Sequence, residues 1–482
     1  MRRLIFVWVI AAWLAELAAA GTVTIWPAPE GEELSRAFTV AVEGQETPVY
    51  VARVAPENPE LRWKAMDDKA NSADYYENAA FTTFGMDGAV EVVVTCPEPV
   101  DSARVLPTSL GIAPRVEGRC VHVTMAEPQS LTLEVNGDWV HSLHILANPP
   151  EPDPPRQDDP NVIYFGPGIH EVTHLEVGSG QTLYVAGGAV VRGVIGPDEP
   201  FRISSYSGLK TYSPTFHLRG ENITVRGRGI IDGSLSTTHA RNLMLVEGAD
   251  IRLEGVILRD SSTWNIPIRR SDRVTVRNVK ILGYRANSDG IDICNSRDVL
   301  VEDCFIRTLD DLIVVKTDRG AGAAQRIVAR NCVLWNEVAH ALSVGAELRE
   351  DVADVLFTDC DVIHDKGREW TLRVYHCDAA RITNIRFENL RIEESPRLIS
   401  LWIDKAFWTQ DEQRGHIDGV VFRNIVAPAA RIELNGFDAE HAIENVLFHD
   451  VTFGGRPLEA ADIHQDEFVR GVTVTRSAEP QP

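Results

Sequence analysis

The sequence predicts an all-β protein, built mainly as a right-handed parallel β-helix with a small β-sandwich-like domain before it. Three observations support this prediction. Short alternating strands dominate, a hexad recurs about every 25 residues, and a Pro-rich segment separates two regions. At 482 residues the chain exceeds the size of one ordinary hydrophobic core, so two domains or one elongated repeat are expected.

Residues 1–20 are typical of an export signal. Arg2 and Arg3 supply positive charge, residues 4–15 are apolar, and three Ala residues precede Gly21 as a small-residue cleavage site. The apolar stretch is too short to span a bilayer, and no other stretch could cross one. We therefore expect a protein without a membrane span that is periplasmic or secreted.

The remaining chain divides into three parts. Residues 21–148 contain short strands such as AVEVVVTC and SLTLEVNG, which predict an N-terminal β-sandwich-like domain. Residues 149–161 are rich in Pro and Asp and predict a stiff, solvated linker. The β-helix is expected over residues 162–478. The seven Cys are too few for a disulfide framework in this length, and pairing of Cys96 with Cys120 is left open.

Composition narrows the class of partner. The net charge of −23 argues against nucleic acid, because phosphate binding needs a basic stripe and the sequence has none. The same charge would repel a polyanionic substrate unless a local Arg or Lys offsets it. No Cys/His cluster has zinc spacing, so no metal or cofactor is expected. The sequence carries no signal of oligomeric state.

The β-helix is predicted from the hexad. Each copy has an apolar or small residue, a polar residue, then Asn, Asp or Gly, and then a mostly apolar alternation. The fourth residues of successive copies are Val256, Val279, Cys304, Cys332, Cys360, Leu390, Ile425 and Val451. Equivalent residues of neighbouring coils should stack about 4.8 Å apart, so the three Cys are expected as buried hydrophobic residues. The Asn and Asp before them are expected in turns, bonding the backbone.

The strands that follow four successive hexads place acids in one column. They read Asp289-Gly-Ile-Asp-Ile, Asp311-Leu-Ile-Val-Val, His340-Ala-Leu-Ser-Val and Trp370-Thr-Leu-Arg-Val. The third and fifth positions are apolar throughout, as a strand with one face in the core requires. The first residues should therefore align, with Asp310 one residue upstream. The fourth positions should face solvent: Asp292, Val314, Ser343 and Arg373.

Such a cluster indicates chemistry, because like charges about 5 Å apart repel and give the fold no stability. Coupling between carboxyl groups would raise one pKa, leaving a proton donor beside a pair that activates water. Acid and base separated by roughly 6.5–9.5 Å would leave room for that water, and hydrolysis would invert the configuration. A calcium site is the alternative, since clustered Asp oxygens also suit that ion.

The stretch NSDGID, followed by LDD, His340 and Arg373, resembles glycoside hydrolase family 28, the polygalacturonase-type β-helix enzymes. The family shows Asn-Thr-Asp, Asp-Asp, Gly-His-Gly and Arg-Ile-Lys in this order. The likeness covers about residues 160 to 460, including NITVRGRGIIDG and DSSTWNI. It implies a pectin-lyase-like fold and an inverting glycosidase that acts on a carbohydrate substrate.

The resemblance also implies roles for single residues. Asp310 would be the general acid, Asp289 and Asp311 would activate water, His340 would support the acid–base network, and Arg373 would bind sugar. Further candidates for substrate binding are Asn287, Trp370 and Tyr375.

Three motifs depart from the family pattern. Thr is replaced by Ser288, the residues around His340 are Ala339 and Ala341, and Arg-Ile-Lys is Arg-Val-Tyr375. The Lys that would pair with a uronate carboxylate is therefore absent. Together with the acidic chain, this leaves a neutral or differently substituted glycan open beside galacturonan. Family 49, the dextranase-type enzymes with three comparable Asp, is another relative to consider. A polysaccharide lyase and a non-catalytic glycan-binding β-helix remain alternatives.

Overall fold

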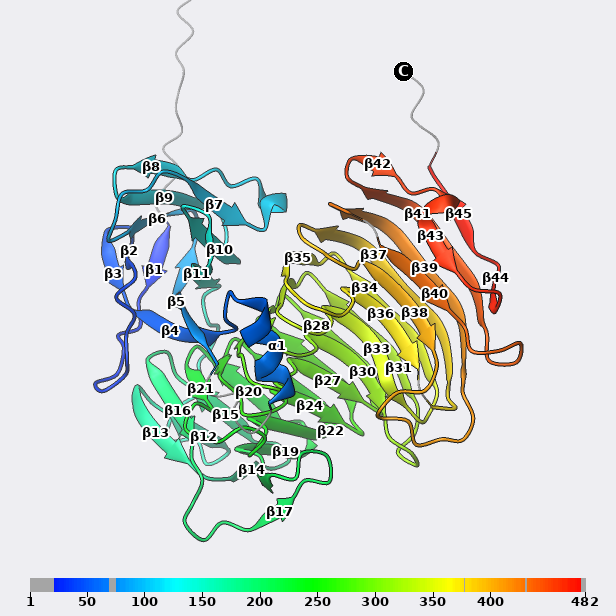
Figure 1. Cartoon of the computed structure of the whole chain (residues 1–482). Helices are drawn as coiled ribbons and strands as arrows, with labels where there is room; N and C mark the ends of the chain where they lie inside the picture. Colours follow the sequence, from blue (N-terminus) through cyan, green and yellow to red (C-terminus); the bar gives the residue numbers. More distant parts are fainter. Residues whose placement is uncertain (1–20, 69–74, 377, 430, 478–482) are drawn as a thin grey trace, which may run out of the picture.

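The computed structural model describes residues 21–68, 75–376, 378–429 and 431–477 (Figure 1). The expected export signal, residues 1–20, lies outside the described residues. Within those ranges, no helix has the length and apolar character needed to cross a membrane.

Two β-sheets form the N-terminal part. The first contains β1 (Thr22–Thr24), β4 (Val49–Val54), β5 (Glu77–Asp87), β7 (Ala103–Leu106), β10 (Ser130–Val135) and β11 (Asp138–Asn148). The second contains β2 (Thr39–Val42), β3 (Gln45–Thr47), β6 (Val90–Thr95), β8 (Arg115–Glu117) and β9 (Cys120–Met125). Alternate side chains of both sheets share one core, so the two sheets pack face to face. This arrangement supports residues 21–148 as a proposed domain.

Two local features of this part differ from the simplest reading of the sequence. An α-helix, α1 (Pro59–Asp67), interrupts the strands; Asn58 caps it by accepting a hydrogen bond from the Glu60 N–H, and Pro59 occupies its first turn. Cys96 and Cys120 are both free thiols, so the open question of their pairing is answered in the negative.

The second part is a right-handed parallel β-helix in which each coil contributes to stacked rows of parallel strands. The row that carries the predicted site consists of β14 (Leu175–Val177), β19 (Phe216–Glu221), β22 (Met244–Glu254), β24 (Ile266–Arg269), β27 (Ile291–Cys294), β30 (Ile313–Thr317), β33 (Leu342–Leu348), β36 (Leu372–His376), β38 (Ile399–Ile403), β40 (Ile432–Asn435) and β43 (Ile463–Gln465). We call it the site row.

The row before the site row in each coil, the preceding row, consists of β13 (Gly168–Val172), β16 (Ala189–Gly193), β21 (Ile230–Asp232), β23 (Ile257–Arg259), β26 (Lys280–Leu282), β29 (Phe305–Thr308), β32 (Val333–Asn336) and β35 (Asp361–Asp365). The third row consists of β12 (Val162–Phe165), β15 (Thr182–Val185), β20 (Thr224–Gly227), β25 (Asp272–Arg277), β28 (Arg297–Glu302), β31 (Ala324–Arg330), β34 (Val352–Thr358), β37 (Arg381–Ile392), β39 (His416–Ala427), β41 (Ile443–Phe453), β44 (Val469–Arg470) and β45 (Thr473–Thr475). Outside the rows lie the hairpin β17 (Phe201–Ile203) and β18 (Lys210–Tyr212), the short β42 (Arg456–Pro457), and the 3-10 turns η2 (Thr108–Leu110) and η3 (Ala460–Asp462).

The hexad marks a sharp turn between coil segments. Its third residue has a φ between 51° and 81° in every copy: Gly255, Asn278, Asp303, Asn331, Asp359, Asn389, Asn424 and Asp450. Gly, Asn and Asp are the residues that tolerate this left-handed conformation best, which explains the pattern. The three Cys that follow are buried free thiols in the β-helix core, as predicted.

The N-terminal part packs on the outer side of the preceding row (Figure 1). Their contact contains an apolar cluster and, within it, a buried ion pair of the β-helix. Arg307 Nε lies 2.9 Å from Glu337 Oε1, and both side chains are fully buried. Arg307 Nη1 also lies 3.2 Å from Nε2 of His144, on β11. We call this contact the seam.

Candidate active site

The predicted column exists in the backbone register. Asp292 on β27 pairs with Val314 on β30, Val314 pairs with Ser343 on β33, and Ser343 pairs with Arg373 on β36. The third and fifth positions of all four strands lie in the β-helix core. Because the strands stack in register, the residues that precede them are also brought to adjacent coils.

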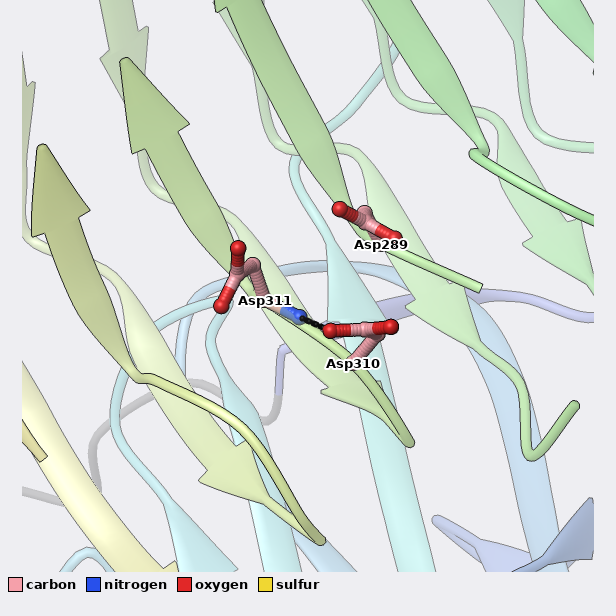
Figure 2. Close-up of side chains that lie close together, drawn as sticks. All are labelled: Asp289, Asp310 and Asp311. Atoms are coloured by element: carbon pink, nitrogen blue, oxygen red, sulfur yellow. Dashed lines mark hydrogen bonds between the residues drawn. The ribbon is translucent and has the colours of Figure 1, made fainter. Parts of the chain in front are cut away.

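The three predicted acids converge at the start of β27 and β30 (Figure 2). One carboxylate oxygen from each of Asp289, Asp310 and Asp311 lies within 4.8 Å of the other two. At most 4.8 Å separates these oxygens, whereas the roughly 6.5–9.5 Å expected from the sequence is a separation between whole carboxyl groups. A gap of this size suits a single water molecule held between two carboxylates.

Asp310 is fixed by its neighbours in the turn. Its Oδ1 accepts a hydrogen bond from the Asp311 N–H at 3.0 Å, the dashed line of Figure 2. Its Oδ2 accepts from Nδ2 of Asn287 at 3.3 Å. Asn287, predicted as a substrate-binding residue, has a φ of 56° and therefore holds the left-handed turn that aims its amide at Asp310.

Lys316, which the sequence reading did not select, lies in the middle of the acids. Its Nζ is 2.9 Å from Asp289 Oδ2, 2.9 Å from Asp292 Oδ1 and 3.7 Å from Asp311 Oδ2. The ammonium group also lies 4.3 Å from the centre of the Trp264 ring. Although burial lowers the pKa of Lys316, Asp289 and Asp292 raise it well above its usual value, so the group is a permanent cation.

Two carboxyl groups of the cluster, those of Asp311 and Asp292, have raised pKa values. Burial is the main cause that raises the pKa of Asp311 well above its usual range; Lys316 opposes it, and Asp310 and Asp289 add to it. Burial and Asp289 likewise raise the pKa of Asp292. Burial and mutual repulsion thus favour the protonated forms of Asp311 and Asp292, while Lys316 favours their ionised forms.

His340 is held as a neutral imidazole. Its Nδ1 lies 2.7 Å from the backbone oxygen of Trp370, so Nδ1–H donates and Nε2 is left as an acceptor. Nε2 lies 3.5 Å from Nη1 of Arg373. Burial and Arg373 lower the pKa of His340 well below its usual value. The neutral ring therefore holds Trp370 and Arg373 through its two nitrogens without carrying charge.

Arg373 faces the same site from the next coil. Its Nη1 donates to Glu369 Oε2 at 3.1 Å, and its guanidinium carbon lies 4.3 Å from the Tyr375 ring centre and 5.7 Å from that of Trp402. The tyrosine ring meets His340 edge-on at 5.0 Å. Tyr375, the residue in place of the family lysine, thus supports Arg373 with an aromatic face.

Trp370 has a more limited place in the site than expected. Its side chain is only 6% exposed, and the guanidinium carbon of Arg431 lies 5.5 Å from its ring centre. The contact shown by the structure is made by its backbone oxygen to His340. Its role in substrate binding stays a prediction.

The expectation that the fourth positions meet solvent is wrong for three of the four, because only Arg373 is partly exposed. Asp292, Val314 and Ser343 are fully buried, and the acids themselves are 1% (Asp289), 6% (Asp310) and 4% (Asp311) exposed. The side chains do point outward, but Lys316 lies against Asp292, and Trp264 lies against Lys316. The alternation of a strand fixes the direction of a side chain and not what covers it.

The missed residues left a signal in the sequence. Lys316 is two positions after Val314 and therefore shares its face of the strand, and Trp264 belongs to the quoted stretch DSSTWNI. The three acids also have the geometry of a cation site. Lys316 already supplies positive charge to two of them, which lowers the need for a divalent ion.

The chain resembles known proteins in sequence and in fold. The profile of Glycosyl hydrolases family 28 matches residues 220–461. A probable polygalacturonase of Vitis vinifera is 24% identical over 31% of this chain and 33% of its own length. The exopolygalacturonase clone GBGE184 of Arabidopsis thaliana is 23% identical over 45% of this chain and 50% of its own. The chain thus spans a third to a half of these curated relatives.

Solved structures share the fold. Dex49A from Penicillium minioluteum superposes with a TM-score of 0.60 and 13% identity over 94% of this chain and 96% of its own. An exopolygalacturonase from Thermotoga maritima gives a TM-score of 0.53 and 18% identity over 65% of this chain and 83% of its own. The profile match covers half of the chain and includes every acid of the cluster. The chain belongs to Glycosyl hydrolases family 28.

Proposed function

We propose that this protein hydrolyses O-glycosidic bonds of a polysaccharide or oligosaccharide, with inversion of configuration. One observation carries the proposal: Asp289, Asp310 and Asp311 converge within 4.8 Å on adjacent coils, around a buried lysine that balances their charge. Membership of family 28 supports the same reaction.

The reaction divides between two sets of groups. Asp310, the most exposed of the acids, donates its proton to the glycosidic oxygen. Asp289, whose ionised form Lys316 stabilises at 2.9 Å, takes a proton from water with Asp311 as that water attacks the anomeric carbon. The bond to the leaving sugar breaks as the new C–O bond forms.

The positively charged side chains of the site, Lys316 and Arg373, limit how many carboxylates a substrate can carry. Lys316 is occupied by carboxylates, so we assign substrate contact to Arg373, whose side chain is partly exposed and paired with Glu369. A single partly neutralised guanidinium suits a neutral sugar or one uronate and not a run of carboxylates. Polygalacturonate, the substrate that the relatives' names indicate, is one candidate, and a neutral glycan is the other.

The lyase alternative is less well supported, because the arginine that would act as its base is paired with Glu369 at 3.1 Å. We also propose that residues 1–20 direct export, and that the mature protein is periplasmic or secreted.

The decisive experiment compares Asp310→Asn with Asp289→Asn. We expect each to lower kcat by about 10²- to 10⁴-fold while substrate binding, measured by calorimetry, persists. An aryl glycoside with a good leaving group should restore turnover in Asp310→Asn only, because that leaving group needs no proton. NMR of the first-formed anomer should show inversion.

Asp359→Asn is the matched control. Asp359 occupies a left-handed turn position where the neighbouring coils carry Asn331 and Asn389, so it should leave activity unchanged. Near-normal turnover of polysaccharide by Asp310→Asn, or retention of configuration, would reject the assignment.

A further inference from the structure

Two long connections of the β-helix meet above the site row. Residues 194–215 join β16 to β19 and carry the hairpin β17–β18, whose paired residues Ile203 and Lys210 leave residues 204–209 as its tip. Residues 404–415 join β38 to β39. The ring of Tyr206, in the hairpin tip, lies 6.1 Å from the ring of Phe407 in the second connection.

This contact spans most of the site row. Between β19 and β38 lie β22, β24, β27, β30, β33 and β36, so the two connections leave the row about 34 Å apart at a strand spacing of about 4.8 Å. The interior of the coils is filled by the hydrophobic core. The two connections therefore reach each other across the outer face of these strands, the face that carries Asp292, Lys316 and Arg373.

Contacts at both ends show where the two connections cross the strands. Tyr206 stacks on His239, in the turn before β22, with ring centres 6.1 Å apart and an interplanar angle of 19°. Trp408, next to Phe407, accepts a hydrogen bond through its backbone oxygen from Nη2 of Arg349 at 2.9 Å, just past the end of β33. The path runs diagonally from the start of β22 to the end of β33. We call Tyr206, Phe407 and Trp408 the arch.

The arch contributes little to the stability of the fold. Phe407 is 80% exposed and Tyr206 is 41% exposed, so their contact buries little apolar area. Yet the connection beneath is firmly held: Asp378 Oδ1 accepts hydrogen bonds from the N–H groups of Gln410 at 2.7 Å and Asp411 at 2.8 Å. A well-anchored loop that presents exposed aromatic rings points to a role other than packing.

The N-terminal part limits a second side of the site. Ala65 of α1 packs against Leu309, the residue before Asp310. Tyr76 contacts Tyr284, in the turn before Asp289, with ring centres 5.5 Å apart. Tyr206 lies on the side of β22, the arch ends at β33, and α1 lies beside the turns, so the direction left for a substrate chain runs along β36 and β38, where Arg373 and Trp402 lie.

We propose that the arch closes the site on the side of the earlier coils, so that a polysaccharide enters by one end and is cut near that end. The inference rests on the proposed function and specifies its mode: release of small products from chain ends, not cleavage within chains. Arg373 and Trp402 then contact the part of the chain that extends beyond the cut bond.

Product analysis tests the mode of cleavage. The full chain is incubated with polygalacturonate and with dextran, one acidic and one neutral linear polymer, and products are sized over time. We expect one short product from the first time point while the polymer keeps its length. A ladder of intermediate lengths from the wild type would overturn the proposal.

A shortened hairpin sharpens the test. Replacing residues 204–209 by Asn-Gly leaves the Ile203–Lys210 pair closed by a two-residue turn and removes Tyr206. Intermediate lengths should then appear, several-fold above the wild-type level. Ile203→Thr, an exposed change in the stem of the same hairpin, is the control and should keep the wild-type products. An unchanged product pattern in the shortened variant would overturn the proposal.

The arch is also tested without substrate. In the double variant Tyr206→Cys Phe407→Cys, a short bismaleimide should link the two introduced thiols, and neither single variant should be linked. Failure of the folded double variant to cross-link would contradict the arch. If the link forms but no polymer is cleaved, the proposed function fails and the arch stands.

Discussion

Replacing Lys316 by Met should change both the stability and the pH dependence of the enzyme. The methionine keeps most of the apolar stem under Trp264 and removes the ammonium group. That group lies 2.9 Å from Asp289 and Asp292 and 3.7 Å from Asp311. The variant therefore leaves three buried carboxyl groups without a cation.

These distances set the size of the expected loss of stability. Two unit charges about 4 Å apart interact by about 4 kcal/mol at an effective dielectric constant of about 20, and removing one partner of a buried pair costs about 3–5 kcal/mol. We therefore expect the free energy of unfolding to fall by about 3–5 kcal/mol. Lys316 also lowers the pKa of Asp311 and Asp292, so its loss raises both.

The sign of the pH effect is fixed by the proposed roles. Activation of water needs an ionised carboxylate, so a higher pKa moves the acid limb of the activity profile to higher pH. The assay is kcat/KM against pH, with chemical denaturation for stability. Adding Asp292→Asn to Lys316→Met removes one unpaired carboxylate and should recover part of the stability. A single variant with the wild-type profile and wild-type stability would refute the reasoning.

Two further predictions concern the strands around the site. Burial raises the pKa of Asp365 to about 7, so the folded state holds a proton that the unfolded state releases above its usual 3.8. The free energy of unfolding should therefore fall by up to about 4 kcal/mol as pH rises towards 7. Asp365→Asn should reduce that fall, measured by thermal melts at pH 5 and pH 8. Equal pH dependence in both proteins would contradict this. Gly345→Ala should destabilise the protein and lower activity, because φ is +122° and a Cβ would lie 1.8 Å from the backbone oxygen of Tyr375. In Gly320→Ala the added Cβ meets no atom within 4 Å, so the loss of stability should be far smaller. Equal melting temperatures for the two glycine variants would count against the clash.

The repeat made much of the fold predictable. The left-handed turn residue of each hexad, such as Asn331, and the buried Cys332 after it are local requirements of every coil. The register that aligns Asp289 with Asp311 follows from the same repeat, because a one-residue slip would turn each apolar residue away from the core. A sequence period is enough to predict such features.

The predictions that were wrong concern residues whose surroundings depend on contacts outside the repeat. The outer face was expected to meet solvent, but Trp264 covers Lys316 from a nearby coil, and the connections that carry Tyr206 and Phe407 come from distant coils. Nothing periodic encodes those contacts. The helix α1 was also missed, although Asn58 and Pro59 form a recognisable start signal, because the surrounding strand pattern outweighed a short segment.

The seam has a consequence for how such a chain can evolve. Arg307 and Glu337 belong to the β-helix, and the arginine is covered by Trp335 of the β-helix and by His144 of β11. A β-helix inherited without its partner would expose a charged pair and the apolar side chains around it. Gene fusions that exchange this N-terminal part for another would have to rebuild that patch as well.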